Sequence, residues 1–221
     1  MLEQRYRKDY DGEFVILDTR LVNGVKQETR EWIPNLIQNN HTSGRAAVIG
    51  SRYDQDRFKH QRLANHKGGL LGSKRLQTYS TGDIWQDMRL DFYVSTNRKT
   101  LGEALATNYD VDTVIFSNAN MCMANPGRLY PIPYGPYLAD QALAAYLACF
   151  DGHTEIFLLG FNRETAWDDR MIIPDMIRVM QTYTGVRFVS IGGPAGQPDG
   201  FLDQPNLEVM PIRQFVTYCD I

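Results

Sequence analysis

Small polar residues follow several short apolar runs of the sequence, at the points where we expect β-strands to end. Hydroxyl, amide and backbone N–H groups of this kind can bind a nucleotide or a sugar without much charge. Polar residues also simply end strands, but parallel strands would gather these groups at one edge of a sheet. The groups are Gly50-Ser51, Ser80-Thr81-Gly82-Asp83, Ser95-Thr96-Asn97, Ser117-Asn118 and Gly160-Phe161-Asn162.

The segment after the first of these runs suits a phosphate group. The run RAAVIG at 45–50 predicts a strand, and Ser51 and Arg52 lead from it into a polar helical stretch at 55–66. A strand that turns through Gly-Ser into a helix presents backbone N–H groups to an anion. A guanidinium can add two hydrogen bonds to phosphate. The turn lacks the GxGxxG pattern, so the alternative is that Arg52 is an ordinary solvated side chain.

The stretch from Tyr134 to Asn162 indicates a loop, a helix, a turn and a buried strand. Pro136 favours the first position of the helix, and a helix that starts near Gly135 has the geometry of an anion site. The alanines between 139 and 148 let this helix pack closely on a sheet, and the run EIFLL at 155–159 predicts the strand. The alternative is an ordinary packing unit without a ligand.

The order of these elements predicts the fold class. Apolar runs at 45–50, 76–79, 90–94, 112–116, 155–159 and 186–191 are separated by helical patterns, among them those at 101–108 and 172–183. Short apolar runs between helices are typical of parallel strands covered on both faces. We therefore expect an α/β protein: a single Rossmann-like domain at 45–221, with a mostly parallel sheet and helices on both faces. Residues 1–44 form a lead-in with a β-hairpin, because Asn23-Gly24 is a strong turn signal.

The bulk composition limits the classes of partner. The chain has 221 residues and a formal net charge of −3, which does not indicate nucleic-acid binding. No apolar run approaches the roughly 20 residues of a membrane span. The N-terminal residues are charged where a signal peptide needs an apolar segment, and the three cysteines lack zinc-site spacing. These features favour a cytoplasmic protein and give no indication of its oligomeric state.

From Arg45 to Phe215 the chain resembles a known group of proteins. The order of AVIGSR, LQTYSTGD, LDFYVSTN and the 134–162 segment ending in EIFLLGFN is similar to that of bacterial sialyltransferases with a Rossmann-like nucleotide domain. It is also similar to that of the related proteins with a 6-hydroxymethylpterin pyrophosphokinase-like fold. The resemblance implies a nucleotide-sugar ligand and glycosyl transfer, for which no cofactor is required.

The chain departs from this pattern at three points. The first loop lacks the family's Gly-Pro-Ser, and the later helix opens with Tyr134-Gly135 in place of Ser-Gly. The family's histidine base is missing between Asn162 and Ile172. Asp168 or Asp169 could replace it as a carboxylate base. Both could equally be solvated loop charges or a helix cap.

The sequence therefore leaves three hypotheses. The first is a glycosyltransferase-like protein that binds a nucleotide-sugar. The second is a nucleotide or pterin phosphotransferase, which needs Mg²⁺ near the phosphates, with Asp83 as the candidate ligand. The third is a non-catalytic Rossmann-like protein that has lost its site. We expect no resident metal for the first, with Asp168 and Asp169 as catalytic candidates and these nucleotide-binding candidates: Gly50, Ser51, Arg52, Thr81, Gly82, Asp83, Ser95, Asn97, Tyr134, Gly135, Gly160 and Asn162.

Overall fold

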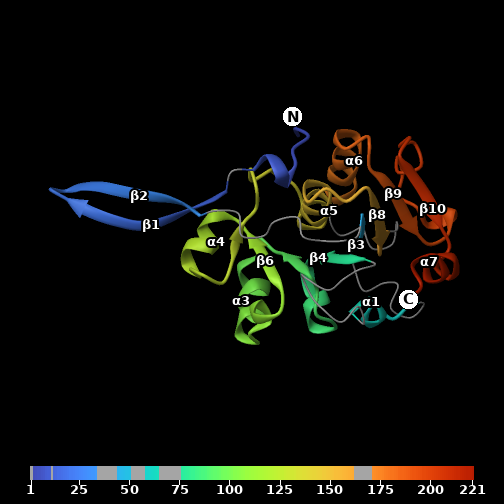
Figure 1. Cartoon of the computed structure of the whole chain (residues 1–221), viewed down its shortest axis with the longest axis horizontal. Helices are drawn as coiled ribbons and strands as arrows, with labels where there is room; N and C mark the ends of the chain where they lie inside the picture. The colour runs from blue at the N-terminus through green and yellow to red at the C-terminus, as the bar shows by residue number, and fades with distance from the viewer. Residues whose placement is uncertain (1, 11, 34–43, 51–57, 65–75, 162–170) are drawn as a thin grey trace.

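A computed structural model of the chain describes residues 2–10, 12–33, 44–50, 58–64, 76–161 and 171–221. These residues form a sheet with helices on both faces, from which a long two-stranded hairpin projects (Figure 1). The predicted α/β fold is confirmed. The Rossmann-like character is also confirmed, because every strand pairing in the main sheet is parallel.

The main sheet has eight strands in the order β10-β9-β8-β3-β4-β5-β6-β7. Successive strands are added on one side of β3 as far as β7, and then on its other side from β8 to β10. The direction of winding thus reverses between β3 and β8, which is where open α/β sheets have a crevice. The strands are β3 (Arg45–Ile49), β4 (Gln77–Ser80), β5 (Phe92–Val94), β6 (Val114–Ser117), β7 (Tyr130–Pro131), β8 (Glu155–Leu159), β9 (Arg187–Ile191) and β10 (Leu207–Met210).

Two apolar clusters cover the two faces of the sheet. Alternate residues of a strand point to opposite faces, so Val48 and Leu158 belong to one cluster and Ile49 and Leu159 to the other. Helices α5 (Asp140–Phe150) and α6 (Ile172–Thr182) cover the first face. The second is covered by α1 (Gln61–Ala64), α3 (Arg98–Ala106) and α7 (Ile212–Cys219). The other helical segments among the described residues are α4 (Ala119–Ala124), η1 (Arg7–Asp9), η3 (Gly82–Gln86), η4 (Tyr109–Val111) and η5 (Pro194–Gly196).

The predicted N-terminal hairpin is confirmed and is longer than its sequence pattern indicated. Strands β1 (Glu13–Val22) and β2 (Val25–Ile33) pair antiparallel and form a sheet of their own. Asn23 and Gly24 both have positive φ, 54° and 78°, which is the signature of the type I′ turn that Asn-Gly favours. The base of β1 contacts α4 and β7.

A buried ion pair attaches the N-terminal segment to the sheet. Arg7 Nε donates to Asp151 Oδ1, and both residues are only 2% exposed. The Arg7 guanidinium also lies near the Phe150 and Phe116 rings, 5.1 and 5.5 Å from their centroids. The hydroxyl of Tyr79 donates to the other carboxylate oxygen over 2.8 Å. Burial, with the Asp151 charge, raises the pKa of Tyr79 well above its ordinary value, so this hydroxyl stays a donor.

We expect Asp151→Ala to lower the free energy of unfolding by about 3–5 kcal/mol, because it leaves the Arg7 cation buried without this carboxylate. Chemical denaturation of the purified variant measures the loss. Asp112→Ala is the control, since Asp112 is exposed and such substitutions usually change stability by less than about 0.5 kcal/mol. A loss below about 1 kcal/mol for Asp151→Ala would show that the pair contributes little.

Candidate functional site

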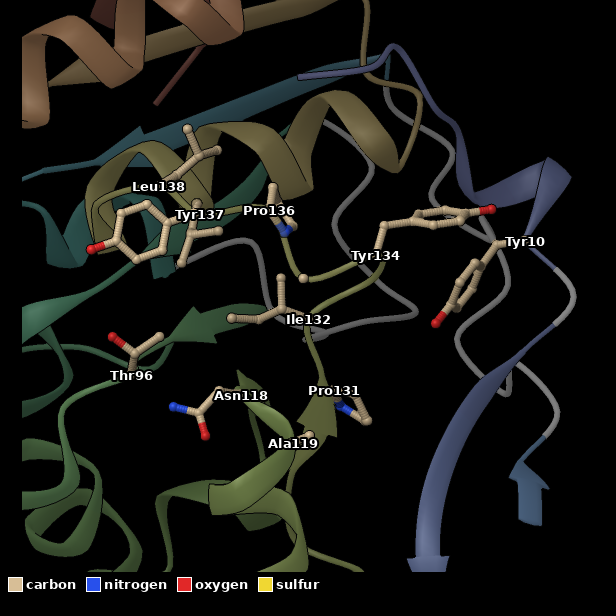
Figure 2. A pocket seen from close by; sticks show the side chains of 12 residues that line it. Tyr10, Thr96, Asn118, Ala119, Pro131, Ile132, Tyr134, Pro136, Tyr137 and Leu138 are labelled. Carbon is tan, nitrogen blue, oxygen red and sulfur yellow. The ribbon is translucent and has the colours of Figure 1, made fainter. Parts of the chain in front are cut away.

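A cavity of about 520 Å³ lies beside the carboxyl ends of β5 and β6. Its volume is in the range of small-molecule sites. Residues that follow β5, β6 and β7 line it together with the start of α5 and the N-terminal segment. The lining consists of Tyr10, Thr96, Asn118, Ala119, Pro131, Ile132, Tyr134, Gly135, Pro136, Tyr137, Leu138 and Leu143. In Figure 2, Tyr10 and Tyr134 flank one side, and Thr96, Asn118 and Tyr137 lie on the other.

Two polar side chains of the lining are held by the fold. The hydroxyl and backbone N–H of Thr96 both donate to the Asp140 carboxylate, over 2.7 and 3.0 Å. The Thr96 hydroxyl oxygen therefore remains available as an acceptor. Asn118 is the N-cap of α4, and its side-chain oxygen accepts the Met121 N–H over 3.1 Å. This leaves the Asn118 amide nitrogen as a donor, with no partner assigned in the described part of the chain. Thr96 and Asn118 thus contribute one acceptor and one donor to the cavity, beside the hydroxyls of the lining tyrosines.

The turn that carries Tyr134 forms an aromatic wall of the cavity. Gly135 N–H donates to Ile132 C=O over 3.0 Å, and Tyr134 has a φ of 58°. A type II turn with proline at its second position has this pattern, but glycine or asparagine usually occupies the position of Tyr134. The Tyr134 ring lies 5.0 Å from that of Tyr10, and the Arg5 guanidinium lies 4.1 Å from its centroid. These contacts hold a bulky residue in a left-handed conformation, a strain that often marks functional positions.

The lining of the cavity is electrically neutral. None of its 12 described residues has a charged side chain, and most of them are apolar or aromatic. A neutral lining with ring faces suits an uncharged heterocycle or sugar, whereas a phosphate would need cations or free N–H groups. The cavity therefore fits the neutral part of a ligand such as a nucleotide.

The helix start predicted near Gly135 is wrong, and with it the reason for expecting an anion site at that residue. Helix α5 begins at Asp140, with Ala139 as its N-cap, so Pro136 precedes the helix and is not its first residue. The N–H of Ala139 donates over 2.8 Å to Asp175, a buried carboxylate of α6. Asp140 adds a second carboxylate in the first turn. Two protein carboxylates thus lie at the start of α5, whereas Tyr134 and Gly135 line the cavity.

Several other candidates have structural roles at the sheet edge. A Cβ atom on Gly50 would lie 2.8 Å from the Phe161 ring, so the glycine allows β3 and β8 to end side by side. Gly82 has a φ of 63°, and its carbonyl accepts the Tyr93 hydroxyl over 2.7 Å. Asn97 caps α3 by accepting from two of its N–H groups. These contacts explain the residue types without a ligand.

The remaining candidates divide into two groups. Thr81 and Ser95 are buried, Asp83 is exposed, and Gly160 is buried with a φ of 75°. All four lie at the carboxyl edge, outside the lining of the cavity. The second group lies outside the described residues and comprises Ser51, Arg52, Asn162, Asp168 and Asp169.

Among the lining residues that sequence reasoning missed, four have polar side chains. Thr96 and Asn118 stood in the polar groups at strand ends, but they were not among the site candidates, although their positions after β5 and β6 were a sufficient signal. Tyr137 is 92% exposed and follows the predicted Tyr134-Gly135 pair closely. Tyr10 belongs to the N-terminal lead-in and had no signal, because a long-range ion pair places its segment on the sheet.

No protein-family model, curated protein or solved structure matches this chain. Within the described ranges, no three His, Cys, Asp or Glu residues are grouped as they would need to be to hold a metal ion. None of the described helices combines the length and apolar character needed to cross a membrane. The resemblance to sialyltransferases therefore remains a prediction.

We expect Asp175→Ala to lower the free energy of unfolding by about 2–3 kcal/mol, because the start of α5 and Arg178 both lose a buried acceptor. Denaturant unfolding measures the loss. Arg178→Ala is the matched control: its side chain is 44% exposed and pairs with Asp175 over 2.8 Å, so its removal should cost less than about 1 kcal/mol. Equal losses for the two variants would contradict a specific role of Asp175 at the start of α5.

Proposed function

We propose that this protein binds a nucleotide or nucleotide-sugar at the carboxyl edge of its sheet, with the nucleoside in the neutral cavity. The observation that carries the proposal is a cavity of about 520 Å³ with aromatic walls at the ends of parallel strands. Open α/β sheets bind ligands at this edge. Ring faces together with a few placed polar groups are typical of sites for heterocycles.

The lining residues suit a nucleoside in three ways. The tyrosine rings offer faces on which a base can stack. The Asn118 amide nitrogen is a donor, and the Thr96 hydroxyl oxygen is an acceptor whose orientation Asp140 fixes. A base or ribose that presents an acceptor beside a donor would bind both, and an analogue that lacks one of them would leave a polar group unsatisfied.

The phosphates and the sugar would extend from the cavity toward the reversal point between β3 and β8. Ser51 and Arg52 follow directly after Gly50 at the end of β3, and the segment with Asp168 and Asp169 follows Phe161 after β8. We assign phosphate binding to the first segment, because a guanidinium and N–H groups stabilise a departing phosphate. The second segment supplies a carboxylate that removes the proton of an acceptor hydroxyl. The proposed reaction is glycosyl transfer, in which that oxygen bonds to the anomeric carbon as the bond from this carbon to the nucleotide phosphate breaks.

Binding is tested by the thermal stability of the protein with UDP, CMP, GDP, ADP and inorganic phosphate. We expect at least one nucleotide to raise the melting temperature, and calorimetry then gives its Kd. Ala119→Phe fills the cavity from α4 and should weaken this nucleotide about tenfold or more. Ala124→Phe is the matched control, because Ala124 is exposed on the same helix and outside the lining.

Two outcomes would contradict the binding proposal. In the first, none of the nucleotides changes the melting temperature of the wild-type protein. In the second, Ala119→Phe folds and binds the nucleotide as tightly as Ala124→Phe does, which would place the ligand outside the cavity.

Glycosyl transfer is tested by the release of free nucleotide from nucleotide-sugars in the presence of sugar acceptors. If one aspartate is the base, Asp168→Asn or Asp169→Asn should lower the rate about 10²–10⁴-fold without weakening nucleotide binding. Asp112→Asn is the control on the exposed surface. Binding without release would reject the transfer step alone, and Mg²⁺-dependent transfer of phosphate would favour a phosphotransferase instead.

A further inference from the structure

The β1–β2 hairpin extends away from the body of the protein, and the base of β1 contacts α4 and β7 (Figure 1). Its two strands, of 10 and 9 residues, pair only with each other in the described part of the chain. An isolated two-stranded hairpin is marginally stable in water, and at least a third strand or a packed face is usually needed. We therefore expect a partner to stabilise this long arm.

The tip of the arm is apolar and exposed. Leu21 is 77% exposed, Val25 64% and Val22 41%. These three residues surround the Asn23-Gly24 turn, which itself is well formed. Large apolar side chains gathered at the end of a projecting arm are typical of a contact surface.

The regular edge of the arm belongs to β2. The pairing register shifts between Ile16 and Asp18, so the irregularity lies in β1. Such bulges discourage further pairing on the strand that contains them. Strand β2 runs without interruption from Val25 to Ile33, and its outer edge carries backbone groups that β1 does not use.

The turn determines which backbone groups of β2 point outward. Val22 and Val25 flank the two-residue turn, so their N–H and C=O groups face each other. The groups of an antiparallel strand alternate in direction. Those of Lys26, Glu28 and Arg30 therefore point away from β1, and those of Thr29 point toward it. A strand added to this edge must therefore pair residues whose backbone N–H and C=O groups point outward with residues of the same kind.

We propose that two copies of this chain pair through their β2 strands, antiparallel about Thr29, to form a four-stranded sheet. Thr29 is the midpoint of β2, so this register uses the whole strand. It places Glu28 opposite Arg30 of the second copy, twice by symmetry, and Val25 opposite Ile33. Opposite charges and apolar residues that face each other across a strand pair stabilise it, and a two-fold axis requires a surface that complements itself.

Neighbouring registers are unfavourable. Pairing about Glu28 would set Glu28 against its own copy and Lys26 against Arg30. Pairing about Arg30 would set two arginines directly opposite. Like charges in these positions destabilise a strand pair. Pairing about Gln27 would also set Lys26 against Glu28, but within β2 it would use only residues 25–29. The charge sequence and the length of β2 together thus favour a second copy of the chain, paired about Thr29.

Disulfide trapping tests the register. In the proposed dimer Thr29 faces its own copy in a non-hydrogen-bonded pair, where Cα atoms lie about 4.5 Å apart, a distance that a disulfide can span. Mild oxidation should therefore link Thr29→Cys into a covalent dimer. Thr19→Cys is the control: Thr19 lies opposite Glu28 on β1 and would be separated from its copy by both β2 strands. Cys122, Cys149 and Cys219 are buried and give little background.

Solution mass measured by light scattering tests the charges. The wild-type protein should be a dimer at micromolar concentration, and Glu28→Arg should shift it to monomer. Glu28→Arg combined with Arg30→Glu should restore the dimer. Far-UV circular dichroism checks that each variant is folded. A monomeric wild type would overturn the proposal, as would linkage of Thr19→Cys in preference to Thr29→Cys, which would place the contact on β1.

Discussion

The contact between Arg7 and Asp151 is the interaction on which the cavity and the arm both depend. A buried cation is tolerated only beside a matched carboxylate, and Asp151 provides one where α5 ends. Once Arg7 is fixed, the three residues that follow bring the Tyr10 ring against Tyr134. The chain then continues into β1, whose base rests on α4 and β7. One electrostatic contact between residues 144 positions apart thus positions a wall of the cavity and the base of the hairpin.

The parallel sheet explains why the cavity is neutral. Helices that connect parallel strands begin at the carboxyl edge, so their positive ends gather there. At the start of α5, Asp140 and Asp175 already occupy this environment. A ligand in the adjoining cavity therefore does not need to be an anion. The walls of the cavity consist of aromatic rings, apolar side chains and small polar groups. A neutral cavity suits the neutral part of a ligand, whose charged part would then bind elsewhere along the carboxyl edge of the sheet.

Much of the fold could be predicted because its strands, helices and turns are marked by short patterns of neighbouring residues. Apolar runs between helical patterns indicated the parallel strands, and Asn23-Gly24 indicated the hairpin. The predicted start of α5 was wrong because Pro136 suits a loop as well as the first turn of a helix. In the structure a turn through Pro133 and Tyr134 comes before Pro136, and α5 begins only at Asp140. Tyr10 could not be assigned to the cavity, since its place follows from a contact between distant residues. The short α4 and the C-terminal α7 were not expected, because neither carries a long periodic pattern.

The close approach of Gly50 and Phe161 has an evolutionary consequence. The Phe161 ring is buried and fills the space that a side chain on Gly50 would need. The two residues follow adjacent parallel strands, so position 50 cannot gain a side chain while the Phe161 ring fills this space. A substitution that enlarges position 50 should survive selection only after position 161 has become smaller. In related sequences these two positions should therefore covary, and the order of the replacements should be constrained along each lineage.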